Sequence, residues 1–238
     1  MRYPALVFDV FGTLVDWREG IACHVTAAFA ERGLAIDGAA FADAWRAEYQ
    51  PAMGRVREGA RGYVPLDDLH CENLMRVLSA FGHAKTFTPG EIIAMARAWE
   101  RLDPWPDVVG GLTRLRAHRI VAPCSNGSIA LMTRLSRHAG LPWDCILGAE
   151  IARDYKPKPA VYRAACAALR LAPAEVMMVA AHNADLAAAR AAGLATAFVP
   201  RPLEHGPDQT SDIAPEGDWT IVAGDLLVLA DRLRATPD

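Results

Sequence analysis

The sequence lacks paired cysteine motifs, long apolar runs and an excess of charge of one sign, and each absence excludes a class of protein. Its five cysteines are far apart, with no C-x-x-C spacing, so a zinc site or disulfide framework is poorly supported and we expect buried, reduced thiols; they are Cys23, Cys71, Cys124, Cys145 and Cys166. No apolar run approaches the roughly 20 residues needed to span a bilayer, and residues 1–4 show no signal-peptide pattern. We therefore expect a cytoplasmic location and no membrane partner.

The charge balance also narrows the choice of partner. Lys and Arg together number 25 and Asp and Glu 28, which gives a formal net charge of -3 over 238 residues. Nothing in this balance suggests binding to nucleic acid or to an anionic membrane. A small anionic substrate would have to be attracted by charges gathered locally. The length allows one large domain, or a core with a modest insertion.

Apolar, β-branched segments alternate with helix-like stretches over most of the chain. Four segments have the character of buried parallel strands and two are weaker candidates; the strong ones are 5–10, 119–125, 175–181 and 195–200, and the weak ones 144–149 and 219–223. Between them, apolar residues recur at helical spacing over 107–118, 128–139, 159–170 and 184–193. The alternation predicts an α/β fold, a Rossmann-like parallel sheet with helices on both faces.

The alternation fails between about residues 16 and 98. There the pattern predicts helices over 19–33, 38–50, 66–82 and 89–101, with "TPGE" at 88–91 as a helix start. The segment 54–65, "GRVREGARGYVP", is the most loop-like and most basic piece. The sequence thus predicts a helical insertion after the first strand.

Polar residues follow several of the predicted strands. Asp9 lies at the end of the first, Ser125 and Asn126 lie at the end of the second, Lys156 lies in the loop after the weak strand at 144–149, and the segment 182–185 follows a further strand. Ligands of open parallel sheets bind beyond the carboxyl ends of the strands, so these residues are expected to form one site. Gly12, three residues after Asp9, allows a sharp turn that exposes amide groups near this carboxylate.

Taken together, these segments resemble the four motifs of the haloacid dehalogenase superfamily. The motifs are "FDVFGTL" (8–14), "SNGS" (125–128), "YKPKPAVY" (155–162) and "VAAHNAD" (179–185), in that order. The resemblance implies a core of residues 1–15 and 99–238 and a helical cap of residues 16–98. It also implies that Asp9 is a nucleophile that forms a covalent intermediate.

Two positions distinguish branches of this superfamily. Its phosphatases carry a second Asp two residues after the nucleophile and an acidic magnesium ligand in the fourth motif; this chain has Phe11 and Ala181 there. A hard cation needs several oxygen ligands, and Asp9 and Asp185 would be the only obvious ones. The chain more closely resembles the metal-free L-2-haloacid dehalogenases, whose nucleophile motif reads Asp, any residue, aromatic, Gly-Thr. This implies hydrolysis of short 2-haloalkanoic acids to 2-hydroxy acids, with inversion at the α-carbon and no metal or other cofactor.

The resemblance also assigns roles around Asp9. Thr13 would hydrogen-bond to this carboxylate, and Lys156 would pair with it and keep it ionised. Arg46, in "WRAEYQ", and Asn126 would stabilise the departing halide.

The remaining substrate contacts follow from the same resemblance. The hydroxyl of Ser125 and the backbone amides of Val10 and Phe11 would hold the substrate carboxylate. Tyr162 matches a further family position, although an aromatic residue on a core-facing helix also suits packing.

The fourth motif departs from better-known members, which have Ser-Ser-Asn-x-Trp-Asp where this chain has "AAHNAD" (180–185). We hypothesise that His182 compensates, either by positioning water for attack on the Asp9 ester or by adding a donor to the leaving-group site. Asp185 would act as a base or as the partner of Lys156. The alternative for His182 is a helix cap.

Two other functions stay open from sequence alone. One is a magnesium-dependent phosphatase or phosphonatase of the same superfamily, which Phe11 and Ala181 oppose. The other is a catalytically silent binding protein of the same fold, which the Ala180–Ala181 pair permits and the intact Asp9 and Lys156 oppose. The resemblance also allows a homodimer.

Overall fold

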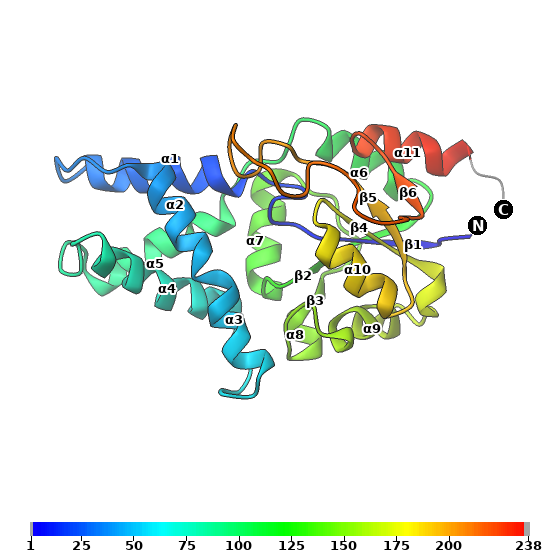
Figure 1. The fold of residues 1–238 in the computed structure, drawn as a ribbon, viewed down its shortest axis with the longest axis horizontal. Coiled ribbons are helices and arrows are strands. Elements are labelled where there is room, and N and C mark those ends of the chain that lie inside the picture. Colours follow the sequence, from blue (N-terminus) through cyan, green and yellow to red (C-terminus); the bar gives the residue numbers. More distant parts are fainter. Residues whose placement is uncertain (1, 236–238) are drawn as a thin grey trace.

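The computed structural model describes residues 2–235 and centres on a six-stranded parallel sheet (Figure 1). The strands lie in the order β3-β2-β1-β4-β5-β6. Their bounds are Ala5–Phe8 for β1, Ile120–Ser125 for β2, Leu147–Gly148 for β3, Val176–Ala180 for β4, Ala195–Phe198 for β5 and Ile221–Val222 for β6. All six predicted strands and the predicted α/β class are confirmed.

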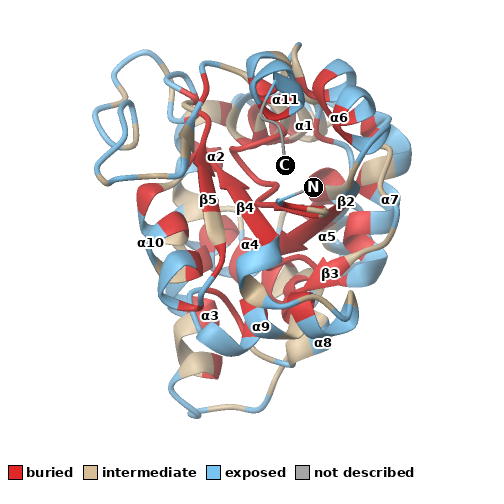
Figure 2. Cartoon of the chain, turned by 90° about the vertical axis from the view of Figure 1, so that its right-hand side faces the viewer, coloured by how far each residue is buried: buried red, intermediate tan, exposed pale blue. Residues whose placement is uncertain are grey.

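Both faces of the sheet are covered, as a parallel sheet requires. Successive side chains of β1 alternate between two buried clusters, with Leu6 and Phe8 in one and Ala5 and Val7 in the other. The first face packs against α6 (Val108–Arg116), α7 (Ile129–Ala139) and α11 (Leu226–Ala235). The second packs against α9 (Pro159–Ala168) and α10 (Asn183–Ala191). The strands are accordingly buried almost throughout (Figure 2).

The register of the central strands brings the polar residues together. Phe8, the last residue of β1, pairs with Pro123 of β2 and Val179 of β4. The next residues of all three strands therefore emerge at one edge of the sheet, where Asp9 follows β1 directly.

Residues 17–100 are helical apart from their connecting loops and lie to one side of the sheet (Figure 1). The helices are α1 (Trp17–Ala30), α2 (Gly38–Ala47), α3 (Tyr49–Arg57), α4 (Leu66–Ala80), α5 (Pro89–Ala96) and the 3₁₀ turn η1 (Arg97–Glu100). Thr88 caps α5 in a reciprocal capping box with Glu91, as "TPGE" predicts. The helical insertion is confirmed, while its exact boundaries as a separate domain stay a prediction.

The structure corrects the predicted helix over 38–50, which is broken at Glu48 into α2 and α3. Pro51 explains the break, because it has no N–H to bond to the carbonyl of Ala47 and its ring clashes with that carbonyl in a continuous helix. Helix α3 then runs on to Arg57, so the predicted loop over 54–65 begins only after that residue.

Three further elements were missed: α11, the short helix α8 (Ala149–Ala152) and the 3₁₀ turn η2 (Pro173–Glu175). All five cysteines are free, as expected, but the expectation of burial is wrong for Cys23, which is exposed on α1, and Cys71 and Cys145 are only partly buried. Within residues 2–235 no helix is long and apolar enough to cross a bilayer.

Candidate active site

A cavity of about 480 Å³ lies at the carboxyl edge of the sheet, between the strands and the helical insertion. Seven of the predicted site residues line it: Asp9, Phe11, Arg46, Asn126, Lys156, His182 and Asp185. Residues separated by more than 170 positions in sequence are therefore neighbours in one cavity.

Asp9 is the most heavily bonded carboxylate in this cavity. Its Oδ2 accepts hydrogen bonds from the Thr13 hydroxyl (2.7 Å) and from Nδ1 of His182 (3.1 Å), and its Oδ1 accepts one from Nζ of Lys156 (2.8 Å). Burial alone would raise the pKa of Asp9, but the charge of Lys156 and the bond from His182 hold it well below its usual range. Asp9 is therefore ionised at neutral pH.

Lys156 joins two carboxylates. Its ammonium also donates to Oδ2 of Asp185, whose Oδ1 accepts a hydrogen bond from the Tyr162 hydroxyl. Burial opposes its charge, but Asp185 and Asp9 together hold the pKa of Lys156 well above its ordinary value. Both oxygens of Asp185 are thus engaged, which makes it the partner of Lys156.

His182 occupies the N-cap position of α10, yet its side chain makes no capping hydrogen bond. Instead its two ring nitrogens lie within hydrogen-bond distance of two carboxylates, Asp9 and Glu204, with Nε2 at 2.8 Å from Glu204 Oε2. Ionised carboxylates only accept, so both nitrogens must donate and the ring is an imidazolium. Burial opposes this charge, but Glu204 and Asp9 raise the pKa of His182 well above its ordinary value.

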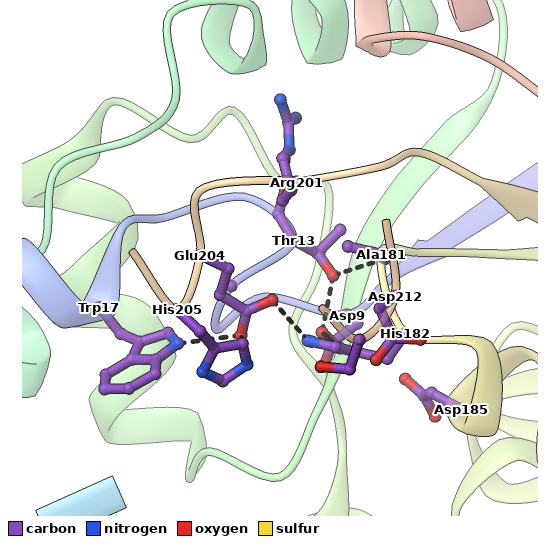
Figure 3. A network of polar contacts seen from close by, with 12 residues as sticks. Asp9, Thr13, Trp17, Ala181, His182, Asp185, Arg201, Glu204, His205 and Asp212 are labelled. Carbon is purple, nitrogen blue, oxygen red and sulfur yellow. Dashed lines mark hydrogen bonds and ion pairs between the residues drawn. The ribbon is translucent and has the colours of Figure 1, made fainter. Parts of the chain in front are cut away.

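Glu204 is the main site residue that sequence reasoning missed. It lies in the long loop after β5, is almost fully buried, and accepts a second hydrogen bond from the Trp17 indole at 2.9 Å (Figure 3). Its carboxylate fills the space beside Gly12, where a Cβ atom would lie 2.0 Å from Oε1 of Glu204. Gly12 also has a φ of +85°, so glycine is required there for two reasons.

Arg46 supplies a cation that forms no ion pair with a carboxylate among residues 2–235. Its guanidinium stacks over the rings of Tyr49, 4.2 Å from the centroid, and Trp17, at 5.2 Å. Its Nη1 is buried and has no hydrogen-bond partner among residues 2–235. Tyr49 also lines the cavity. One end of the cavity therefore carries donors held by aromatic packing.

Four predicted site residues do not line the cavity. Thr13 and Tyr162 instead donate hydrogen bonds to two lining residues, Asp9 and Asp185 respectively. Ser125 is buried, and its Oγ accepts a hydrogen bond from the amide of Gly127 at 3.0 Å. Val10 is also buried, and its carbonyl accepts from the amides of the turn that follows. Their roles in binding a substrate stay predictions.

Features of the sequence could have identified some of the lining residues that were not predicted. Glu204 and His205 follow β5, so the rule that selected Asp9 and Asn126 also applies to them. Tyr49 lies three residues after Arg46, which is neighbour spacing on a helix even though the helix breaks between them. The other missed lining residues are Gln50, Arg57, Pro157 and Ala184.

The donor set favours nucleophilic chemistry over metal binding. Within residues 2–235 no three His, Cys, Asp or Glu side chains are grouped to hold a metal ion. Phe11 and Ala181 carry no oxygen ligands, and the carboxylates present are engaged by Lys156 and His182. An ionised carboxylate can attack an electrophilic carbon, and cations fixed nearby can stabilise the negative leaving group.

Comparisons with known proteins agree with this chemistry. A family model described as a haloacid dehalogenase-like hydrolase matches residues 3–193. An (S)-2-haloacid dehalogenase of Xanthobacter autotrophicus is 30% identical over 201 residues, which cover 83% of this chain and 75% of that protein. The solved structure of a defluorinating L-2-haloacid dehalogenase is 52% identical with a TM-score of 0.96, covering 98% of this chain and 96% of that one. The L-2-haloacid dehalogenase of Xanthobacter autotrophicus with chloropropionic acid covalently bound is 25% identical, with a TM-score of 0.82 and coverage of 99% and 100%.

Proposed function

The chain belongs to the haloacid dehalogenase-like hydrolase family, and from that premise we propose that it hydrolyses the carbon–halogen bond of short 2-haloalkanoic acids. Three relatives are named as (S)-2-haloacid dehalogenases and others as phosphoglycolate phosphatases, and haloacetates and L-2-halopropionates are the substrates that we propose. The observation that carries the proposal is Asp9, an ionised carboxylate fixed by Thr13, Lys156 and His182. The same cavity holds Arg46, whose Nη1 has no hydrogen-bond partner in the described part of the chain.

The first step is attack by Asp9 on the α-carbon, on the side opposite the halogen. Oδ2 already accepts two hydrogen bonds and Oδ1 accepts one, so Oδ1 is the freer nucleophile. The new C–O bond takes the electron pair of Oδ1, and the C–halogen pair leaves with the halide. Configuration at the α-carbon inverts once, and the product of this step is an aspartyl ester with free halide.

Arg46 and Asn126 receive the departing halide. The side-chain oxygen of Asn126 accepts from the amide of Lys156 at 2.8 Å, so its amide nitrogen is directed elsewhere and can donate. Nη1 of Arg46 is a second donor in a mostly desolvated site, where such bonds are strong. The Ser125 hydroxyl and the Val10 and Phe11 amides hold the substrate carboxylate.

Hydrolysis of the ester depends on His182. In the resting site the charge on Asp9 helps to keep His182 protonated. Esterification removes that charge and so lowers the pKa of His182, which favours release of the Nδ1 proton to solvent and lets Nδ1 act as a base. Water then attacks Cγ of Asp9 and gives a proton to Nδ1 of His182, while Thr13 stabilises the oxyanion on Oδ2. On collapse that proton passes to the departing oxygen, which completes the hydroxyl group of the 2-hydroxy acid. The carboxyl proton of the regenerated Asp9 then returns to His182. Glu204 holds the ring through Nε2 in both states.

The decisive experiment is halide release from chloroacetate and L-2-chloropropionate with EDTA present. Wild-type protein is expected to release halide and Asp9→Asn to release none. In a single turnover in H₂¹⁸O, the label is expected in Asp9, because water attacks its carboxyl carbon. No release from any short haloacid would remove the assignment. Phosphatase activity that rises with Mg²⁺ would instead favour the phosphatase alternative.

This proposal is accompanied by two expectations, one about cellular location and one about oligomeric state. A cytoplasmic location suits a small, charged substrate and free thiols such as Cys124 and Cys166. The homodimer allowed by the resemblance is tested by light scattering on the purified protein.

A further inference from the structure

The backbone of Lys156 is held from two sides. Its N–H donates to the side-chain oxygen of Asn126 at 2.8 Å, and Asn126 directly follows β2 of the sheet. Its carbonyl accepts a hydrogen bond from Nη1 of Arg57, also at 2.8 Å, and Arg57 is the last residue of α3 in the helical insertion. The lysine that contacts Asp9 is therefore fixed by groups from both parts of the molecule.

Arg57 is not committed to a carboxylate. Its Nη2 lies 3.3 Å from the backbone oxygen and 3.1 Å from the side-chain oxygen of Gln50, and it forms no ion pair in the part of the chain that the structure describes. The full charge of this guanidinium is thus available to the carbonyl of Lys156, which makes the bond charge-assisted and stronger than one between neutral groups.

A second contact joins the insertion to the same loop. The hydroxyl of Tyr155, the residue before Lys156, donates to the carbonyl of Val64, and its ring lies 5.4 Å from that of Tyr63. Figure 1 shows α3 and the loop after it beside α8, the helix that precedes the loop of Tyr155 and Lys156. Two adjacent residues of the core, Tyr155 and Lys156, are thus tied to two consecutive segments of the insertion.

We propose that Arg57 is a positioning residue that couples the seating of the helical insertion to the alignment of Lys156 with the nucleophile Asp9. Arg57 acts through the backbone of Lys156. With the guanidinium in place, Nζ of Lys156 is held 2.8 Å from Oδ1 of Asp9. Without it the carbonyl loses a charged donor and the loop gains freedom. The proposal rests on the proposed function only in taking Asp9 as the nucleophile.

The kinetic test compares Arg57→Met with wild type in single turnovers of L-2-chloropropionate. The rate constant of ester formation is expected to fall on the order of 10-fold, which corresponds to the loss of one hydrogen bond to a charged group. The half-saturating concentration is expected to stay within about 2-fold. Arg57→Lys should restore part of the rate, because an ammonium group can still donate to the carbonyl.

The matched control is Arg61→Met, which removes an arginine from the same segment. The guanidinium of Arg61 pairs with Glu72 inside the insertion at 2.8 Å and does not line the cavity. Wild-type kinetics are expected for this variant. If Arg57→Met raised only the half-saturating concentration, the guanidinium would be a substrate-binding charge and the proposal would be overturned. Equal kinetics for the two variants would also overturn it.

The pH profile of ester formation gives a second readout. Asp9 faces Lys156 and His182, which are linked in turn to Asp185 and Glu204. A loosened Lys156 stabilises the carboxylate less, so the pKa of Asp9 rises and the acid limb of the profile moves to higher pH in Arg57→Met. A limb that stays in place contradicts the coupling.

A third readout needs no substrate and therefore separates this proposal from the proposed function. The chain has three lysines, and only Lys156 is buried, while Lys85 and Lys158 are exposed. In ¹⁵N-lysine spectra the Lys156 ammonium should be the one group whose protons exchange slowly with solvent. We expect full protection in wild type and in Arg61→Met, and partial protection in Arg57→Lys. In Arg57→Met we expect the protection to be lost. Unchanged protection of the Lys156 ammonium in folded Arg57→Met would overturn the proposal, even if the wild type dehalogenates. If Arg57→Met does not fold, Arg57→Gln takes its place in this test.

Discussion

Glu204→Gln isolates the contribution of a buried carboxylate that lies behind His182. The substitution keeps the shape of the side chain and an oxygen for the Trp17 indole, which lies 2.9 Å from Oε1, but removes the charge paired with the imidazolium. The bonds from Thr13 and Lys156 to Asp9 are untouched, so ester formation is expected to stay within a few-fold of wild type. Ester breakdown loses an oriented base and should slow about 100-fold.

The same substitution has a predictable effect on stability. Breaking a buried ion pair costs about 3 kcal/mol at the lower end of the usual range. The lower end applies because the side chain of His182 is 21% exposed, whereas that of Glu204 is 1% exposed. The free energy of unfolding of Glu204→Gln near pH 6 should therefore be lower than that of wild type by about this amount.

The pH dependence follows from the directions of the two pKa shifts. The raised pKa of His182 stabilises the fold fully below its ordinary value of 6.5, and this contribution is lost as pH rises through the higher folded value. The lowered pKa of Glu204 stabilises above its ordinary value of 4.5, and that contribution is lost as pH falls through the lower folded value. The stability difference between wild type and Glu204→Gln should be largest between pH 4.5 and 6.5 and shrink on both sides.

The assay combines rapid quench with mass spectrometry of the intact chain. Glu204→Gln should show a burst of halide equal to the enzyme concentration and an accumulating ester on Asp9, and His182→Ala should behave alike. Glu48→Gln, which alters a partly exposed carboxylate paired with Arg76, is the control and should match wild type. Breakdown of the ester at the wild-type rate in Glu204→Gln would refute the role given to the pair.

Two further substitutions test the surroundings of this pair. Gly12→Ala places a Cβ atom against Glu204 at a residue with φ of +85°, so urea unfolding should show a loss of about 3 kcal/mol or more, with slower ester breakdown. Arg46→Met removes a buried donor that has no partner in residues 2–235, so halide release should fall about 100-fold while the unfolding midpoint stays the same or rises. A lower midpoint would show that the Arg46 guanidinium is mainly structural.

Fold class and much of the site could be predicted because both depend on local patterns. The buried strands are short apolar runs, and each predicted polar residue at a strand end belongs to a motif with its own spacing. Asp9, Lys156 and His182 were found this way, and their contacts in the structure are direct. The break between α2 and α3 had a local cause in Pro51 but was hidden by the continuous helical pattern around it.

Glu204 could not be predicted with a role, because its position depends on how a long loop folds back. The loop after β5 is fixed by Arg201, whose guanidinium donates to the Thr13 carbonyl at 2.8 Å and pairs with Asp107 at 2.7 Å. Those bonds join residues about 100 to 190 positions apart in sequence, and no periodicity encodes them. The sequence indicated that the fourth motif had lost polar groups, but the carboxylate that supports His182 comes from outside all four motifs.

The division of charge in the cavity explains how a chain of net charge -3 can attract an anion. The carboxylates of Asp9, Asp185 and Glu204 face two cations, Lys156 and His182, so these groups together carry one negative charge. Arg46 and Arg57 form no ion pair within the described residues, and both line the cavity. The four cations and three carboxylates together carry a net charge of +1, and Arg46 is the cation directed to the halide, because the guanidinium of Arg57 is bonded to the carbonyl of Lys156. Because this field is local, raising the ionic strength should weaken capture of the substrate more than the chemistry on Asp9.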